Sequence, residues 1–340
     1  MTFRILAVGD HFIPAQEYLD QFEDIKQRDP HLADAELLSV EWDLDKAEQH
    51  RLQQIMEWDG ANALEAPSEI LAAVGNCDAL IAHFAPIGRQ TIEAAGTLKM
   101  IAVARAGLEN IDLETAKAAG VQVSGVVGRN AAAVAELAIG LMLSECRNIS
   151  RADQSIKNGQ WRKEFNVPMV ELGDSVVGII GWGQVARKLA GKLRGLAGKI
   201  LVHDPFVTPD EISAAGATPA EFDEIFQASD FVHVMARLTP ETERFIGKTQ
   251  FAMMKPTAYF INTARSRLVD YDDLLEALQN RKIAGAGLDV FDTEPLPEQS
   301  AWRSLDNVTM TTHYGGETTG TNKTSARLVF EAVSAFRQGH

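Results

Sequence analysis

Hydrophobic residues along this chain fall into short runs of strand length, separated by stretches in which apolar positions recur at helical spacing. In the first part the runs lie at Phe3–Val8, Leu37–Val40, Ala79–Ala82, Met100–Ala104 and Val121–Val123. After Ser175 they lie at Val176–Ile180, Lys199–His203, Phe231–Val234, Tyr259–Asn262, Ile283–Asp289 and Val308–Thr311. Strands that alternate with helices predict an α/β fold with doubly wound, mostly parallel sheets.

Two helical segments carry further information. Residues 129–147 are apolar almost all the way round a helix, which must therefore be buried. It is either a core helix of its own chain or a crossover helix that also packs against a second subunit. We expect the latter, in a homodimer with this helix at or near the twofold axis. Asn130 is a good N-cap for it. A last amphipathic pattern follows His313 and runs to about Arg337, with Thr318 or Thr319 as its N-cap.

Length and charge narrow the function classes. The 340 residues predict about two domains. The formal charge of −15 disfavours nucleic acid and anionic lipid surfaces as partners, because both need a basic face. Two cysteines without a CxxC motif do not form a disulfide framework. No apolar run approaches the roughly 18 residues of a membrane span, and the first run is too short for a signal-peptide core. We therefore expect a soluble, cytoplasmic protein.

A glycine-rich turn, GWGQVA, follows an apolar strand and opens a helix. Gly181 permits the tight turn, and Gly183 lets the backbone approach a pyrophosphate. The N–H groups of Gln184 and Val185 would face the pyrophosphate oxygens at a helix N-terminus. The next strand ends at Asp204, 23 residues after Gly181. Its carboxylate can accept hydrogen bonds from the adenosine ribose and would repel a 2′-phosphate. The sequence therefore predicts a site for NAD rather than NADP.

Polar residues follow three successive strands of the second part. Arg265 follows the strand AYFIN, Asp289 and Glu294 follow GAGL, and His313 follows NVTM. Carboxyl ends of parallel strands are where ligands bind, so these groups should converge beside the cofactor. Hydride transfer from an alcohol needs a base for the hydroxyl proton, and histidine titrates near working pH. A carboxylate would orient the ring, and an arginine can bind a substrate carboxylate. No residue cluster has metal-ligand spacing, so we expect no metal.

At this point the chain resembles a family, the D-isomer-specific 2-hydroxyacid dehydrogenases. The matching strings are GIIGWGQVA, INTARSRLVD, AGAGLDVFDTEPLP and TTHYGGET. The resemblance implies that His313 is the general acid/base, Glu294 its partner, and Arg265 the anchor of the substrate carboxylate and keto oxygen. It also implies NAD-dependent interconversion of a D-2-hydroxy acid and a 2-keto acid. The expected cofactor-binding residues are Gly181, Gly183, Gln184, Val185, Asp204, Thr263 and Asp289, the last beside the nicotinamide.

The resemblance also implies the domain organisation and the substrate side of the site. Two Rossmann-like or flavodoxin-like domains are expected, with an NAD-binding domain at 129–312 inserted into a substrate-binding domain of 1–128 plus 313–340. Backbone amides around Arg105, Ala106 and Gly107 are expected to hold the substrate carboxylate. His83, after the strand ALIA, is expected to border the substrate cleft.

Some features leave alternatives open. The loop RAGLENID is shorter than the form common in the family, and Met235 and Arg237 stand where the family often has His and Pro. Arg105 matches an arginine of phosphoglycerate dehydrogenases, and Arg129 precedes a helix N-terminus, where a cation is disfavoured. We therefore expect one or both to bind a second anionic group of the substrate, such as a phosphate. Arg129 could instead touch the NAD pyrophosphate or pair with a surface acid. Phosphite oxidation stays open, and a non-catalytic NAD(H)-sensing protein of the same fold is the alternative function.

Overall fold

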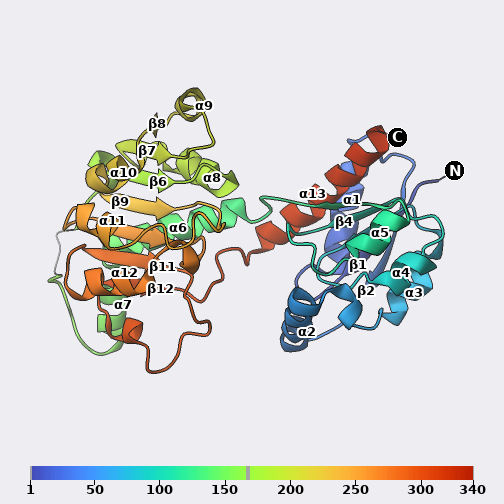
Figure 1. Ribbon diagram of the computed structural model, residues 1–340, viewed down its shortest axis with the longest axis horizontal. Helices are drawn as coiled ribbons and strands as arrows, with labels where there is room; N and C mark the ends of the chain where they lie inside the picture. Colours follow the sequence, from blue (N-terminus) through green and yellow to red (C-terminus); the bar gives the residue numbers. More distant parts are fainter. Residues whose placement is uncertain (1, 166–168, 340) are drawn as a thin grey trace. The chain divides into compact units, whose positions relative to one another are not determined.

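The computed structural model describes residues 2–165 and 169–339, and the chain divides into two compact units (Figure 1). Unit 1 is Met1–Arg129 with Thr318–His340, and unit 2 is Asn130–Glu317. The second boundary differs from the expected one at 312/313. The loop that carries His313 stays with unit 2, so the imidazole belongs to the same unit as the glycine-rich turn.

Unit 1 is built on a parallel five-stranded sheet in the order β2-β1-β3-β4-β5. Its strands are β1 (Arg4–Gly9), β2 (Glu36–Glu41), β3 (Ala79–Ala82), β4 (Met100–Val103) and β5 (Gln122–Gly125). Helices α1 (Ala15–Lys26) and α13 (Thr319–Gln338) lie side by side and cover one face (Figure 1). The other face packs against α2 (Lys46–Asp59), α3 (Ser68–Ala73), α4 (Arg89–Ala94) and α5 (Leu113–Ala118). This is the flavodoxin-like strand order, with its switch point between β1 and β3.

Unit 2 holds a parallel seven-stranded sheet in the order β12-β11-β10-β9-β6-β7-β8. Its strands are β6 (Val176–Ile180), β7 (Lys199–His203), β8 (Thr218–Pro219), β9 (Phe231–Val234), β10 (Tyr259–Asn262), β11 (Gly285–Leu288) and β12 (Val308–Met310). The order is that of a Rossmann fold, whose switch point lies between β6 and β9. The expected fold class is confirmed. The two-residue β8 is missing from the prediction because its sequence has no apolar run.

Helices cover both faces of the second sheet. On one face lie α6 (Ala131–Cys146), α8 (Gln184–Leu193) and α9 (Pro209–Ala214). On the other lie α10 (Phe222–Ala228), α11 (Lys248–Met253) and α12 (Tyr271–Gln279). Helix α7 (Ile149–Lys157) follows α6 directly. Among the described residues, no helix combines the length and apolar composition that crossing a bilayer requires.

The apolar helix α6 buries most of its surface inside unit 2. Ala135, Ala138, Leu141 and Met142 lie in the core against α8 and the sheet. Burial of this helix therefore needs no second subunit, and the argument from its composition does not by itself indicate a dimer. Asn130 stands at the N-cap position, but its side chain makes no capping hydrogen bond, contrary to expectation. The expected cap of α13 is confirmed, since the Thr318 side chain accepts from the Thr321 N–H.

Candidate active site

The glycine-rich turn joins β6 to α8 at the switch point of unit 2. Gly181 has a φ of +94°, and a Cβ there would lie 2.7 Å from the backbone of Ala236, at the end of β9. Only glycine fits this turn without displacing the neighbouring strand end. Gly183 is the N-cap of α8, and a Cβ there would meet no atom within 4 Å. The turn therefore leaves open space before the unpaired N–H groups of Gln184 and Val185, which fits a pyrophosphate.

Asp204 follows β7 and is held against the same turn. Its Oδ2 accepts from the Trp182 N–H at 2.7 Å, and its Oδ1 accepts from the Phe206 N–H at 2.9 Å. Two backbone donors fix the carboxylate while each oxygen retains a lone pair for a ribose hydroxyl. The geometry thus agrees with a negative charge placed to accept from the adenosine ribose and to repel a 2′-phosphate.

Two further positions lie at the carboxyl ends of strands on the other side of the switch point. Thr263, after β10, is buried, and its hydroxyl has no hydrogen-bond partner among the described residues. A buried orphan hydroxyl at this edge fits a cofactor group as its missing partner. Met235 is buried after β9, whereas Arg237 is exposed two residues later, beside the backbone that Gly181 touches. The residues present in unit 2 therefore suit a dinucleotide.

His313 and Glu294 form a direct pair. The imidazole Nδ1 lies 2.7 Å from Glu294 Oε2, and Glu294 Oε1 accepts from the Phe291 N–H at 2.8 Å. The carboxylate is therefore fixed on both sides and selects the tautomer with a proton on Nδ1. The His313 side chain is 45% exposed, so Nε2 remains available to a substrate. This arrangement can give or take one proton at a fixed point.

Asp289 holds the loop that presents His313. Its Oδ1 accepts from the Thr311 hydroxyl at 2.6 Å, and its Oδ2 accepts from the Gly315 N–H at 3.0 Å. His313 has a φ of +55°, a left-handed conformation that is costly for a residue with a side chain. The buried Asp289 carboxylate stabilises this conformation, because it accepts hydrogen bonds from residues on both sides of His313. The contacts in the structure make Asp289 a support for the His313 loop, and its expected place beside the nicotinamide stays a prediction.

Arg265 lies in the expected place but makes a local contact. It follows β10 by three residues, and its Nη1 donates to the Ala264 carbonyl at 2.7 Å. Among the described residues it makes no hydrogen bond to Glu294 or His313. The three groups therefore share the carboxyl edge of one sheet, but only the imidazole and the carboxylate are joined directly.

In unit 1 the switch point between β1 and β3 is filled by a buried pair. His83 follows β3 and is 1% exposed, and its Nδ1 lies 3.2 Å from Oδ2 of Asp10, which follows β1. Burial lowers the pKa of His83 below its ordinary value, despite the opposing charge of Asp10. At neutral pH the pair is thus a neutral imidazole donating to a carboxylate. The expectation that His83 borders a cleft is corrected, because its ring is enclosed by the protein.

Two arginines lie near this pair. Arg105, after β4, stacks on the ring of Phe84, with its guanidinium carbon 4.7 Å from the ring centroid. Arg129 is partly buried, and its one hydrogen bond among the described residues is long, 3.4 Å from Nη1 to the Ser325 hydroxyl oxygen. Burial, and next the positive charge of Arg105, lower the pKa of Arg129. Arg105 pairs with Glu109, whereas Arg129 has no carboxylate in ion-pair contact among the described residues. Two cations that repel each other, one of them without such a partner, are the electrostatic pattern of an anion site. Ala106 and Gly107 continue the same loop.

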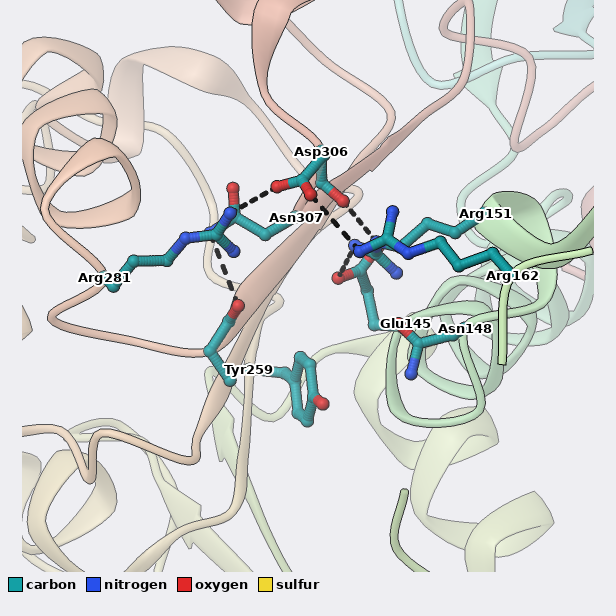
Figure 2. A pocket seen from close by; sticks show the side chains of 9 residues that line it. Glu145, Asn148, Arg151, Arg162, Tyr259, Arg281, Asp306 and Asn307 are labelled. Carbon is teal, nitrogen blue, oxygen red and sulfur yellow. Dashed lines mark hydrogen bonds and ion pairs between the residues drawn. The ribbon is translucent and has the colours of Figure 1, made fainter. Parts of the chain in front are cut away.

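A separate charged cluster lies at the opposite, amino-terminal edge of the second sheet. Figure 2 shows Asp306 between Arg281 on one side and Arg151 and Arg162 on the other. Arg151 also donates to both carboxylate oxygens of the fully buried Glu145, at 3.0 and 2.8 Å. The two carboxylates pair with the three arginines around a cavity of only about 10 Å³. Ligands of parallel sheets bind at the carboxyl edge, so we place the reaction at His313 and not here.

The second unit matches a known family model. The model described as "D-isomer specific 2-hydroxyacid dehydrogenase, NAD binding domain" matches residues 139–315. A solved structure of a D-isomer specific 2-hydroxyacid dehydrogenase from Lactobacillus delbrueckii, in an NAD-complexed form, is similar with a TM-score of 0.75 and 21% identity. That likeness covers 99% of this chain and 97% of the other, and it shows the fold.

Curated relatives extend the similarity over most of the chain. A D-3-phosphoglycerate dehydrogenase of Methanocaldococcus jannaschii is 34% identical over 291 residues, which are 85% of this chain and 55% of that protein. A glyoxylate reductase of Korarchaeum cryptofilum is 33% identical over 283 residues, which are 81% of this chain and 85% of that protein. The chain thus spans about half the length of the first relative and most of the second.

Proposed function

The chain belongs to the D-isomer specific 2-hydroxyacid dehydrogenase family and is an NAD-dependent dehydrogenase, and we propose that it reduces a 2-keto acid bearing a second anionic group to the D-2-hydroxy acid, or catalyses the reverse reaction. The observation that carries the reaction is the His313–Glu294 pair at 2.7 Å in the same unit as the glycine-rich turn. In this proposal unit 2 binds NAD and unit 1 binds the substrate.

The glycine-rich turn and Asp204 would hold NAD, which when bound would supply or accept a hydride at C2 of the substrate. His313 Nε2 donates a proton to the keto oxygen during reduction and accepts it back during oxidation. Glu294 keeps the ring in the tautomer with Nδ1 protonated and stabilises its positive charge. Arg265, freed from the Ala264 carbonyl, binds the substrate carboxylate and keto oxygen through parallel hydrogen bonds. Asp289 keeps the His313 loop in its left-handed conformation.

The second anion is assigned to the arginines of unit 1. Arg129 has no carboxylate partner among the described residues, and its charge is raised in energy by Arg105. A phosphate or carboxylate on the substrate would relieve that repulsion. The backbone amides of Ala106 and Gly107 are then left for the carboxylate next to the reacting carbon. One of the two relatives is named for a phosphorylated substrate and the other for an unphosphorylated one, so the presence of a phosphate on the substrate is the question to test.

A panel assay tests this proposal. NADH oxidation is followed by absorbance with 2-keto acids that do or do not carry a phosphate or a second carboxylate. We expect a preference for the anionic members, and Arg129→Gln should lower kcat/KM for them by about tenfold to a hundredfold, since a charge-assisted hydrogen bond contributes about 1.5–3 kcal/mol. Equal losses on all substrates, or a wild-type preference for glyoxylate, would contradict the second-anion assignment. His313→Ala should abolish turnover of every member.

Assembly is a further part of the proposal. The described residues between 149 and 170 expose large apolar side chains: Ile149, Ile156, Trp161, Met169 and Val170. Trp161 is 74% exposed, which is costly for a side chain of that size in water. We therefore place the interface of the proposed homodimer on these exposed side chains. The sequence had instead suggested the apolar surface of α6.

A further inference from the structure

The guanidinium of Arg105 is paired by an acid from its own loop. Its Nη2 donates to Glu109 Oε2 at 2.8 Å. The Arg105 side chain is 14% exposed and lies on the Phe84 ring, whereas the Glu109 side chain is 42% exposed. The arginine is thus fixed by packing, and the acid is the member of the pair that can leave it for water.

The loop between β4 and α5 is shaped to allow this contact. A Cβ on Gly107 would lie 2.4 Å from Glu109 Oε2 and 2.6 Å from Arg105 Nη2, so the absence of a side chain there lets the two ends meet without shifting. The next residue, Asn110, is fully buried, and its amide donates to the Ala85 carbonyl at 2.9 Å. The buried side chain of Asn110 fixes the loop on one side of Glu109, and Gly107 leaves room on the other, so Glu109 can reach Arg105.

We propose that Glu109 is an internal counter-ion for the second-anion site. It pairs with Arg105 when the bound substrate has no second anionic group, and it gives up the arginine when the substrate supplies a phosphate or carboxylate of its own. This inference rests on the proposed function, and it adds a residue that determines substrate preference. It is built on the short loop RAGLENID of this chain.

Charge compensation supplies the physical reason. With an uncharged substrate tail and no Glu109, Arg105 and Arg129 would repel each other with only the buried Asp10, already paired with His83, as a nearby negative charge. With Glu109 present, Arg105 keeps a partner, so binding of a small keto acid leaves no uncompensated pair of cations. A partly exposed ion pair contributes little to stability, so an anionic tail can displace Glu109 from Arg105 at a small cost in free energy. We expect this cost to weaken binding of the anionic tail by about two- to tenfold. Glu109 therefore reduces the preference for keto acids with a second anionic group over keto acids without one.

The test compares Glu109→Gln with a matched control. Glu114→Gln removes the same charge from an exposed position near the same loop, outside contact with Arg105. We expect Glu109→Gln to shift the ratio of KM values by about two- to tenfold in favour of the phosphorylated over the unphosphorylated keto acid. Glu114→Gln should leave the ratio at its wild-type value. In an Arg105→Gln background, Glu109→Gln should no longer change the ratio.

A binding measurement gives a second readout, independent of turnover. Sodium phosphate, compared with sodium chloride at equal ionic strength, should raise the melting temperature of Glu109→Gln more than that of the wild type. An unchanged KM ratio together with an equal phosphate effect would overturn the inference, as would an equal decrease of KM on both substrates. If Arg105→Gln and Arg129→Gln change the ratio while Glu109→Gln does not, the proposed function stands and only the counter-ion role fails.

Discussion

Replacing Glu294 by glutamine tests the central pair of the proposed mechanism. The change keeps the shape of the side chain but removes its charge, and the amide presents one donor where the carboxylate has two acceptors. One of its two contacts, with the imidazole Nδ1 at 2.7 Å or the Phe291 N–H at 2.8 Å, then becomes a donor facing a donor. The protonated imidazole that forms during oxidation, and that starts reduction, loses its counter-charge.

The size of the effect follows from distance and exposure. Unit charges about 4 Å apart interact by about 4 kcal/mol at an effective dielectric constant of 20, and by about 1 kcal/mol in bulk water. The side chains of His313 and Glu294 are 45% and 35% exposed, so solvent screening places their interaction energy between these two limits. A loss of about 1–3 kcal/mol corresponds to a decrease in kcat of about fivefold to a hundredfold.

Steady-state NADH oxidation, with saturating keto acid, measures this decrease. The KM for NADH should stay near its wild-type value, because Glu294 does not contact the glycine-rich turn. Glu298→Gln is the matched control, since Glu298 is exposed on the same loop and its side chain makes no hydrogen bond or ion pair with the described residues. If Glu294→Gln keeps a kcat within threefold of wild type while its melting temperature is unchanged, the role given to the pair is wrong.

Three further predictions follow from cofactor choice, burial and assembly. Asp204→Ala should raise the KM for NADH and allow use of NADPH; a wild type that already uses both cofactors equally would contradict the assignment. Burial lowers the pKa of His233 to about 3 from an ordinary 6.5, so the unfolded chain takes up a proton below pH 6.5 and the folded chain does not. Its contribution to stability is present above pH 6.5 and is lost by about 1.4 kcal/mol per pH unit below it, or about 2 kcal/mol at pH 5. In urea unfolding, His233→Met should show a flatter decline of stability between pH 6.5 and 5, and an identical slope would refute this. Ile156→Asp should convert the expected dimer into a monomer in light scattering, whereas a wild-type monomer would exclude the dimer.

The cofactor half of unit 2 was predictable because its requirements are local. A tight turn needs glycine at Gly181, and the turn, the following helix and the next strand are consecutive in sequence. The alternation of strands and helices predicted the doubly wound parallel sheets, whereas the order of the strands came only with the structure. The same locality explains the capping of α13 by Thr318, where donor and acceptor are three residues apart.

Predictions that depended on non-local packing were less accurate. His83 follows a strand like the other candidate site residues, but Asp10, 73 positions earlier, encloses it in a buried pair. Asp289 follows β11, and the Thr311 hydroxyl and the amides of Tyr314 and Gly315 at the next strand end donate to its carboxylate. In both cases the sequence placed the residue at the carboxyl end of a strand. Its partner could not be identified from spacing along the chain.

Glu145 shows the physical limit of pattern analysis most clearly. In residue type it resembles Glu136, a solvent-exposed acid of the same helix that pairs with Lys192, although nine residues of helix place the two acids on opposite faces. In the structure Glu145 is fully buried, and Arg151 neutralises it (Figure 2). Gly285 provides the space, because a Cβ there would lie 2.4 Å from Glu145 Oε2. A buried carboxylate is tolerated only when charge and space are supplied together, and here they come from a different helix and from a strand. The polarity of a residue therefore predicts its exposure only after its partners are known, and the same reasoning applies to Glu109, whose role depends on the Arg105 that it meets.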